Sequence, residues 1–224
     1  MDECGGYIPL MIDLSGRQVV VFGGGAVGER KALRFMKHAD VFVYSRSFTP
    51  ALSKAAEKCP RLHLMVRDPA EDLSDDGIKA LIRDAFLVIP ATGDRLFNDR
   101  VAALAARERI LVNPVDGPGE VIVPSSVEKG GLLIAISSNG ASPAITKHAR
   151  VLIESVITDD FEKMIRLQEE LRQTLKETVP DQKDRQEILR AVVGSEKVWQ
   201  ALAVSYEAGK IEAFSAAGLS HTDG

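Results

Sequence analysis

The sequence has few of the residues that build several common kinds of site. Only two of its 224 residues are cysteines, Cys4 and Cys59, and they lie far apart with no metal-ligand spacing. This scarcity argues against a disulfide framework and a zinc site, and it suits a reducing compartment. The histidines also show no ligand spacing, so we predict no metal site; they are His38, His63, His148 and His221.

Long apolar runs and an excess of positive charge are missing as well. No apolar stretch approaches the ~18 residues that cross a membrane, and the N-terminus lacks a signal-peptide pattern. The formal net charge of -4 at pH 7 gives no support to a nucleic-acid partner or a polybasic membrane anchor. We therefore expect a cytoplasmic protein that binds neither nucleic acid nor membranes.

The first half of the chain alternates between short apolar runs and helix-forming stretches. Strands separated by helices imply parallel pairing with right-handed crossovers, so the pattern predicts an α/β fold with a Rossmann-type doubly wound parallel sheet. The predicted strands cover 17–22, 41–44, 62–66, 86–90 and 110–113, and the helices cover 27–37, 51–58, 78–83 and 98–107.

The composition of the sequence changes after Asn113. Residues 114–131 are rich in glycine and proline, and 132–137 form one more apolar strand. Ser142 and Pro143 then have the residue types of an N-cap and a first helical position. From Thr158 onward the sequence is helical and charged. Two apolar stripes at helical spacing there predict a packed core rather than a cofactor site; they comprise Phe161, Met164, Ile165, Leu171 and Leu175, and then Val198, Trp199, Leu202 and Tyr206.

A glycine motif directly follows the first predicted strand. Gly23, Gly25 and Gly28 match G-x-G-x-x-G at the start of a helix, a pattern that cradles the pyrophosphate of a dinucleotide. The helix N-terminus faces the anion, so Ala26 and Val27 join the glycines as predicted cofactor contacts. The alternative is a glycine turn in an α/β protein that binds no nucleotide.

The end of the second strand bears on the choice between NAD and NADP. An NAD site usually has Asp or Glu there, whereas this chain has Ser45, Arg46 and Ser47. By the general rule Arg46 favours the 2′-phosphate of NADP, although it is equally interpretable as a solvated surface arginine. The residues alone leave the choice open, with Arg46 and Ser47 as predicted contacts.

Four segments in order carry a resemblance to the precorrin-2 dehydrogenase family, which includes the N-terminal part of multifunctional siroheme synthases. They are Tyr7-Ile-Pro-Leu, the stretch from Gly23 to Lys31, Asn113-Pro-Val-Asp, and the stretch from Ser137 to Pro143. Ala91-Thr92 and Asn98 add to the match, which covers residues 7 to 150, with a looser helical match beyond. The resemblance implies NAD-dependent oxidation of precorrin-2 to sirohydrochlorin in siroheme biosynthesis by a homodimer.

The resemblance also implies a division into three parts. Residues 1–117 form the NAD-binding Rossmann domain, 118–150 a dimerisation and substrate-binding segment, and 151–224 a helical C-terminal domain. Thr92 joins the predicted cofactor contacts. Some members of the family also insert ferrous iron into sirohydrochlorin, and the residues do not decide whether this chain accepts iron as a second substrate.

Asp116 matches the position of the family's catalytic carboxylate. A loop that leaves the carboxyl end of a parallel strand lies over the crevice where a nicotinamide binds, and removal of a hydride and a proton suits a nearby carboxylate base. The alternative is that Asp116 and Gly117 merely form a turn, since Asp-Gly is a common turn pair.

The proposed substrate carries many carboxylates and needs hydrogen-bond donors. The predicted substrate contacts are Asn113, Ser137, Ser138 and Asn139, next to a helix N-terminus that favours anions.

Other functions remain as alternatives. Tyr206 and Lys210 fit the Y-x-x-x-K motif of alcohol-type short-chain dehydrogenases, but Gly209 lies inside the motif and the segment follows the complete sheet, which indicates coincidence. A non-enzymatic NAD(H)-sensing regulatory domain would share only the glycine loop. A structural dimer that has lost catalysis is the third alternative, and the presence of Asp116 argues against it.

Overall fold

The computed structural model of the chain describes residues 6–67, 74–115 and 119–219. The chain divides into two compact units, Met1–Val123 and Pro124–Gly224. The first unit is built around a sheet with a core on each face, and the second has a helical core of its own.

The sheet of the first unit is parallel throughout, with strand order β3-β2-β1-β4-β5. The order reverses between β1 and β4, which is the topological switch point where ligands bind in folds of this type. The predicted Rossmann-type fold is therefore confirmed. The strands are β1 (Gln18–Phe22), β2 (Asp40–Ser45), β3 (Leu62–Val66), β4 (Ala85–Pro90) and β5 (Leu111–Val112).

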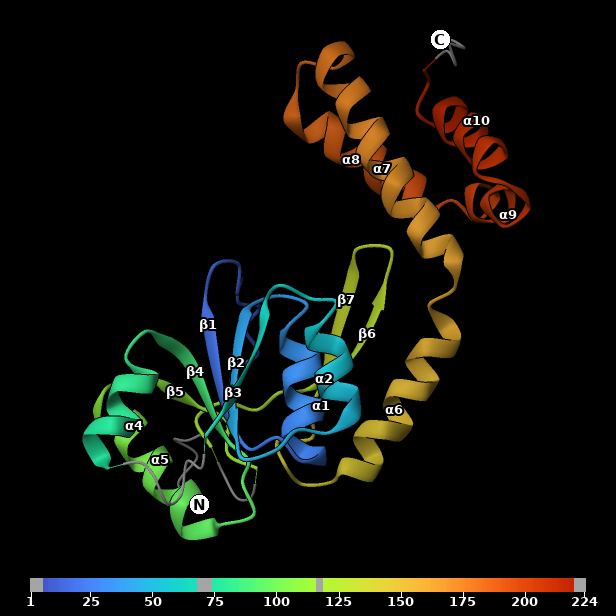
Figure 1. The fold of residues 1–224 in the computed structure, drawn as a ribbon. Coiled ribbons are helices and arrows are strands. Elements are labelled where there is room, and N and C mark those ends of the chain that lie inside the picture. Colours follow the sequence, from blue (N-terminus) through green and yellow to red (C-terminus); the bar gives the residue numbers. More distant parts are fainter. Residues whose placement is uncertain (1–5, 68–73, 116–118, 220–224) are drawn as a thin grey trace, which may run out of the picture. The chain divides into compact units, whose positions relative to one another are not determined.

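Helices cover both faces of this sheet (Figure 1). Side chains of a strand alternate between its faces, so Val19 and Val21 pack in one core while Val20 and Phe22 pack in the other. The first core includes residues of α1 (Ala26–Phe35) and α2 (Pro50–Ala56). The second includes residues of α4 (Asp75–Ile82) and α5 (Arg95–Arg107). Burial on both faces explains why the strands read as unbroken apolar runs.

The second unit begins with a hairpin of β6 (Ser125–Lys129) and β7 (Leu132–Ile136). Gly130 and Gly131 form its two-residue turn with φ of 51° and 89°, a conformation that favours glycine. Only the later strand, β7, was expected from the sequence; β6 was not predicted. Helix α6 (Pro143–Val156) follows, with Ser142 as its N-cap and Pro143 in its first turn, as predicted.

The remaining helices are α7 (Asp159–Thr178), α8 (Gln182–Gly194), α9 (Glu196–Val204) and α10 (Tyr206–Ala216). Their core contains the second predicted stripe and Met164, Leu171 and Leu175 of the first, so these residues are packing surfaces as predicted. Phe161 and Ile165 of the first stripe are only partly buried and lie outside this core, and Leu167, which was not predicted, belongs to it. A side chain at Gly209 would clash with Leu202, so this glycine lets α9 and α10 pack closely. Within the described part of the chain, no helix combines the length and the apolar character that a membrane crossing requires.

Candidate functional site

The glycine loop joins β1 to α1 at the switch point of the sheet. Gly23 has a φ of 115°, a region that favours glycine, and its N–H donates to the Tyr44 carbonyl at 2.9 Å. A side chain at Gly23 would clash with the Ala91 carbonyl, and one at Gly28 would clash with the Gly23 carbonyl. These two glycines are therefore required for the close packing of the loop itself.

Gly25 has a different environment. A β-carbon built on it has no atom within 4 Å, and the residue is exposed. It is the N-cap of α1 and provides no side-chain hydrogen bond to the helix, while exposed Ala26 and half-buried Val27 follow it. The helix N-terminus thus faces open space beside a glycine, which is the arrangement that admits a phosphate. The loop fits a dinucleotide.

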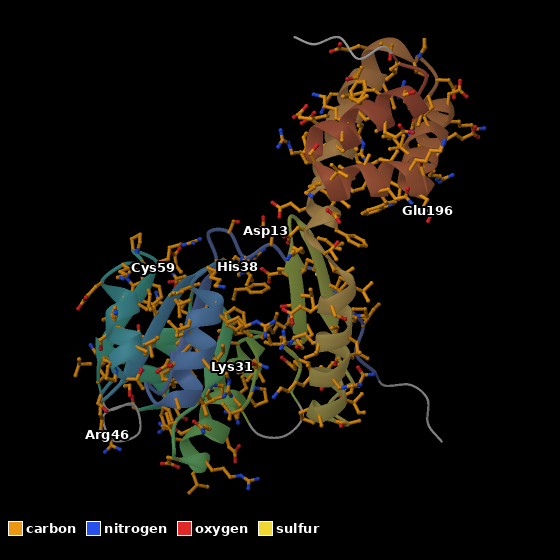
Figure 2. The ribbon with its side chains drawn as sticks, turned by 90° about the vertical axis from the view of Figure 1, so that its right-hand side faces the viewer. Asp13, Lys31, His38, Arg46, Cys59 and Glu196 are labelled. Atoms are coloured by element: carbon orange, nitrogen blue, oxygen red, sulfur yellow. The ribbon has the colours of Figure 1, made fainter. Side chains whose placement is uncertain are left out.

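Gly24 was not singled out in the sequence, yet it ties the loop to the end of β2. A side chain there would clash with the Ser47 carbonyl, and the Gly24 carbonyl accepts from the Thr49 N–H at 3.2 Å. The sequence feature that could have identified Gly24 is the run of three consecutive glycines from Gly23 to Gly25. Ser47 therefore lies against the loop, and Arg46 beside it is exposed (Figure 2).

Thr92 follows β4 and lies on the other side of the loop. A β-carbon built on Gly23 would be 3.0 Å from the Thr92 nitrogen. Asn98 of α5 fixes this residue: its Oδ1 accepts from the Thr92 N–H at 3.1 Å and from Thr92 Oγ1 at 2.7 Å, and its Nδ2 donates to the Thr92 carbonyl at 3.0 Å. The ends of β1, β2 and β4 thus meet around the glycine loop.

Asn113 follows β5 and is buried, with 5% of its surface exposed. Its backbone N–H donates to the Val88 carbonyl at 3.0 Å, and its Nδ2 donates to the Val121 carbonyl at 2.7 Å. Its Oδ1 accepts from Lys31 Nζ of α1 at 2.6 Å. Both polar atoms of the Asn113 side chain therefore have protein partners.

Tyr7, in the N-terminal segment, contacts the part of the chain that follows β5: its hydroxyl donates to the Gly119 carbonyl at 2.7 Å. The hydrogen bonds of Asn113, Tyr7 and Val121 therefore anchor the chain on both sides of residues 116–118. Asp116, the predicted catalytic residue, lies outside the described residues.

The predicted substrate loop belongs to the second unit. Ser138 Oγ donates to the Ser142 carbonyl at 3.1 Å and accepts from the Ser142 N–H at 2.9 Å, and Thr146 Oγ1 lies 3.2 Å from it. Ser137 Oγ accepts from the Asn139 N–H at 3.0 Å, and Asn139 has a φ of 52°. Ser138 therefore shapes the loop, while the side chains of Ser137 and Asn139 are exposed.

Tyr206 and Lys210 both lie near Glu170 within the helical unit. Lys210 Nζ lies 3.2 Å from Glu170 Oε2, and the Arg166 guanidinium stacks over the Tyr206 ring at 4.1 Å. Burial and the neighbouring Glu170 raise the pKa of the Tyr206 hydroxyl. Because this hydroxyl is buried, it serves helix packing and does not act as a proton donor in an open active site.

The parallel sheet with a glycine loop at its switch point defines a dinucleotide-binding protein of the Rossmann class. Residues 10–125 match a family model described as "Putative NAD(P)-binding". The chain is 43% identical over 215 residues to the precorrin-2 dehydrogenase of Methanosarcina barkeri, covering 96% of this chain and 95% of that one. The chain belongs to the precorrin-2 dehydrogenase family.

Two further comparisons agree with this assignment. Siroheme synthase 1 of Klebsiella pneumoniae is 37% identical over 161 residues, which cover 70% of this chain and 32% of that longer protein. The solved structure of SirC, precorrin-2 dehydrogenase, superposes with a TM-score of 0.73 over 95% of this chain and 99% of that chain. At 21% sequence identity, this structural match supports the fold.

Proposed function

We propose that this chain oxidises precorrin-2 to sirohydrochlorin with NAD as the hydride acceptor, a step of siroheme biosynthesis. The observation that supports this most is the glycine loop, whose open position at Gly25 suits a phosphate. It occurs in a chain that is 43% identical to a precorrin-2 dehydrogenase over nearly the whole of both sequences.

The reaction divides between the cofactor and the protein. Bound NAD supplies the acceptor for the hydride that leaves the reduced tetrapyrrole. The chain contributes Asp116 as the base that takes the accompanying proton and later releases it to solvent. Asn98 holds Thr92 after β4, while Asn113 and Tyr7 form hydrogen bonds to Val121 and Gly119, so these residues are positioned before ligands arrive.

The choice of NAD rests on the family resemblance, because exposed Arg46 by itself would suit NADP. We expect a higher kcat/KM with NAD than with NADP, and an Arg46→Ala variant that keeps this preference. A wild-type preference for NADP that disappears in Arg46→Ala would show that Arg46 recognises the ribose phosphate and that NAD is the wrong choice.

Residues 118–150 contribute substrate contacts and a dimer interface in this proposal. The helix N-terminus after Ser142 and the exposed side chains of Ser137 and Asn139 offer donors to the carboxylates of the tetrapyrrole.

The apolar face of α6 supports a homodimer. No residue of α6 is buried, and Ile145, Leu152 and Val156 are 63%, 54% and 66% exposed on one stripe. An apolar stripe of this kind is typical of a contact with another chain. Sedimentation velocity should show a dimer for the wild type and a monomer for Ile145→Asp/Leu152→Asp; a monomeric wild type would contradict this arrangement.

An anaerobic assay tests the proposed activity. The protein is incubated with enzymatically generated precorrin-2 and NAD, and sirohydrochlorin is followed by its absorbance. We expect turnover that requires NAD. Binding of NAD without any turnover would instead support the NAD(H)-sensing alternative. Ferrous iron, added afterwards, tests chelation as a second activity.

A further inference from the structure

The side chain of Lys31 is held in place by a hydrogen bond to an uncharged residue, Asn113. Lys31 lies on α1, three residues after Gly28 of the glycine motif (Figure 2). Its ammonium donates to the carboxamide oxygen of Asn113 at 2.6 Å. Asn113 cannot rotate away, because its own amide is held by the Val121 carbonyl. The ammonium is therefore held beside the residue that follows β5, at the carboxyl end of the sheet.

The charge of Lys31 is not neutralised by this contact. An ammonium has three N–H donors, and Asn113 is a neutral acceptor. Among the residues that the structure describes, no carboxylate forms an ion pair with Lys31. Burial, together with the positive charges of Arg30 and Arg34, lowers the pKa of Lys31. A half-buried cation of this kind, next to two more cations, favours an incoming anion, because electrostatic attraction is stronger where water is partly excluded.

We propose that Lys31 binds a carboxylate of the polycarboxylate substrate and so helps to determine substrate specificity. This inference rests on the proposed function, and it explains how a chain with a net charge of -4 offers a positive site to a polyanion. The carboxylate replaces water at the remaining N–H groups of the ammonium, while Asn113 keeps the ammonium in place. Lys31 takes no part in the transfer of hydride or proton.

The experiment measures the dissociation constant of sirohydrochlorin by absorbance titration, the KM for precorrin-2 and the dissociation constant of NAD. Lys31→Met should raise the first two roughly tenfold and leave NAD binding unchanged, as expected for the loss of one ion pair. Lys31→Arg, which keeps the charge, should recover most of the affinity. Lys37→Met is the matched control, because Lys37 is exposed and the variant loses the same charge; it should bind sirohydrochlorin as the wild type does.

Lys31→Gln separates the charge from the hydrogen bond to Asn113. It keeps a donor but no charge, so it should bind sirohydrochlorin as weakly as Lys31→Met. Wild-type affinity in Lys31→Gln, or equal affinities in Lys31→Met and Lys37→Met, would overturn the proposal. If both uncharged variants fail to fold, the wild-type affinity must weaken with rising ionic strength, and a salt-independent affinity overturns the proposal. A wild type that neither turns over precorrin-2 nor binds sirohydrochlorin contradicts the proposed function instead.

Discussion

Asn98 forms three hydrogen bonds with Thr92, six residues before it in the chain, and holds that residue's N–H, carbonyl and hydroxyl at once. Thr92 follows β4 at the point where the sheet reverses its order, directly beside Gly23 of the glycine loop. One side chain on α5 thus positions a segment that lies beside the glycine loop.

Replacing Asn98 by Ala should loosen this segment. Removal of the three hydrogen bonds should lower the free energy of unfolding by about 1–3 kcal/mol and raise the KM for NAD. Thermal unfolding and steady-state kinetics measure the two effects. The matched control is Asp99→Ala, which changes the next, exposed position of α5 and should leave the KM unchanged. An unchanged KM in Asn98→Ala would show that the Thr92 segment does not contribute to cofactor binding.

Replacement by alanine should have different effects at two glycines of the motif: weaker NAD binding at Gly25 and lower stability at Gly28. At Gly25 the new methyl group enters open space, so Gly25→Ala should keep the thermal stability of the wild type while weakening NAD binding. At Gly28 the methyl group meets the Gly23 carbonyl, so Gly28→Ala should destabilise the fold by about 1–3 kcal/mol. Thermal unfolding of both variants, with NAD titrations, measures the contrast, and equal losses of stability would contradict it.

Gly25→Asp extends this comparison by adding a negative charge where the pyrophosphate would lie. Calorimetric titration with NAD should show no binding, because the carboxylate repels the phosphates and fills their space. Undiminished NAD affinity in a folded Gly25→Asp protein would exclude the glycine loop as the nucleotide site.

The glycine motif, the strands of the parallel sheet and the N-cap of α6 were predictable because each has a local signature. A run such as Val19–Phe22 is apolar at every position only when both faces of a strand are covered. The strand β6 was missed because the glycines and prolines before Ser125 obscure it, although Gly130-Gly131 is a recognisable hairpin turn.

The contacts that order the site were not predictable in the same way. The Lys31–Asn113 and Tyr7–Gly119 hydrogen bonds join residues 82 and 112 positions apart, and no periodicity in a sequence reports such pairs. The role of the Ser138 hydroxyl, whose hydrogen bonds are made within its own loop and helix, was also not predictable. A serine in a loop is equally consistent with ligand binding and with turn formation, and only its partners at Ser142 and Thr146 distinguish the two.

Tyr206→Phe tests whether the Y-x-x-x-K motif has any part in catalysis. We expect unchanged kcat and KM, because the hydroxyl is buried among the helices of the second unit. If Tyr206→Phe lost as much activity as Asp116→Ala, the result would support the alcohol-type short-chain dehydrogenase instead.

The same variant should change the stability at alkaline pH. The pKa of Tyr206 is raised in the folded chain, so the unfolded chain loses this proton first, near pH ~10, and the stabilisation declines as the pH rises further. The free energy of unfolding should therefore decrease less steeply above that pH in Tyr206→Phe than in the wild type. Denaturant titrations at several pH values measure the difference, and equal slopes would contradict the shifted pKa.

The most direct test of the proposed activity compares the wild type with Asp116→Ala and Asp116→Asn in the anaerobic precorrin-2 assay, with the dissociation constant of NAD measured for each protein. We predict NAD-dependent formation of sirohydrochlorin by the wild type, no turnover by either variant, and the same NAD affinity in all three. A wild type that binds NAD without oxidising precorrin-2 would contradict the proposed function, and full activity in the variants would exclude Asp116 as the base.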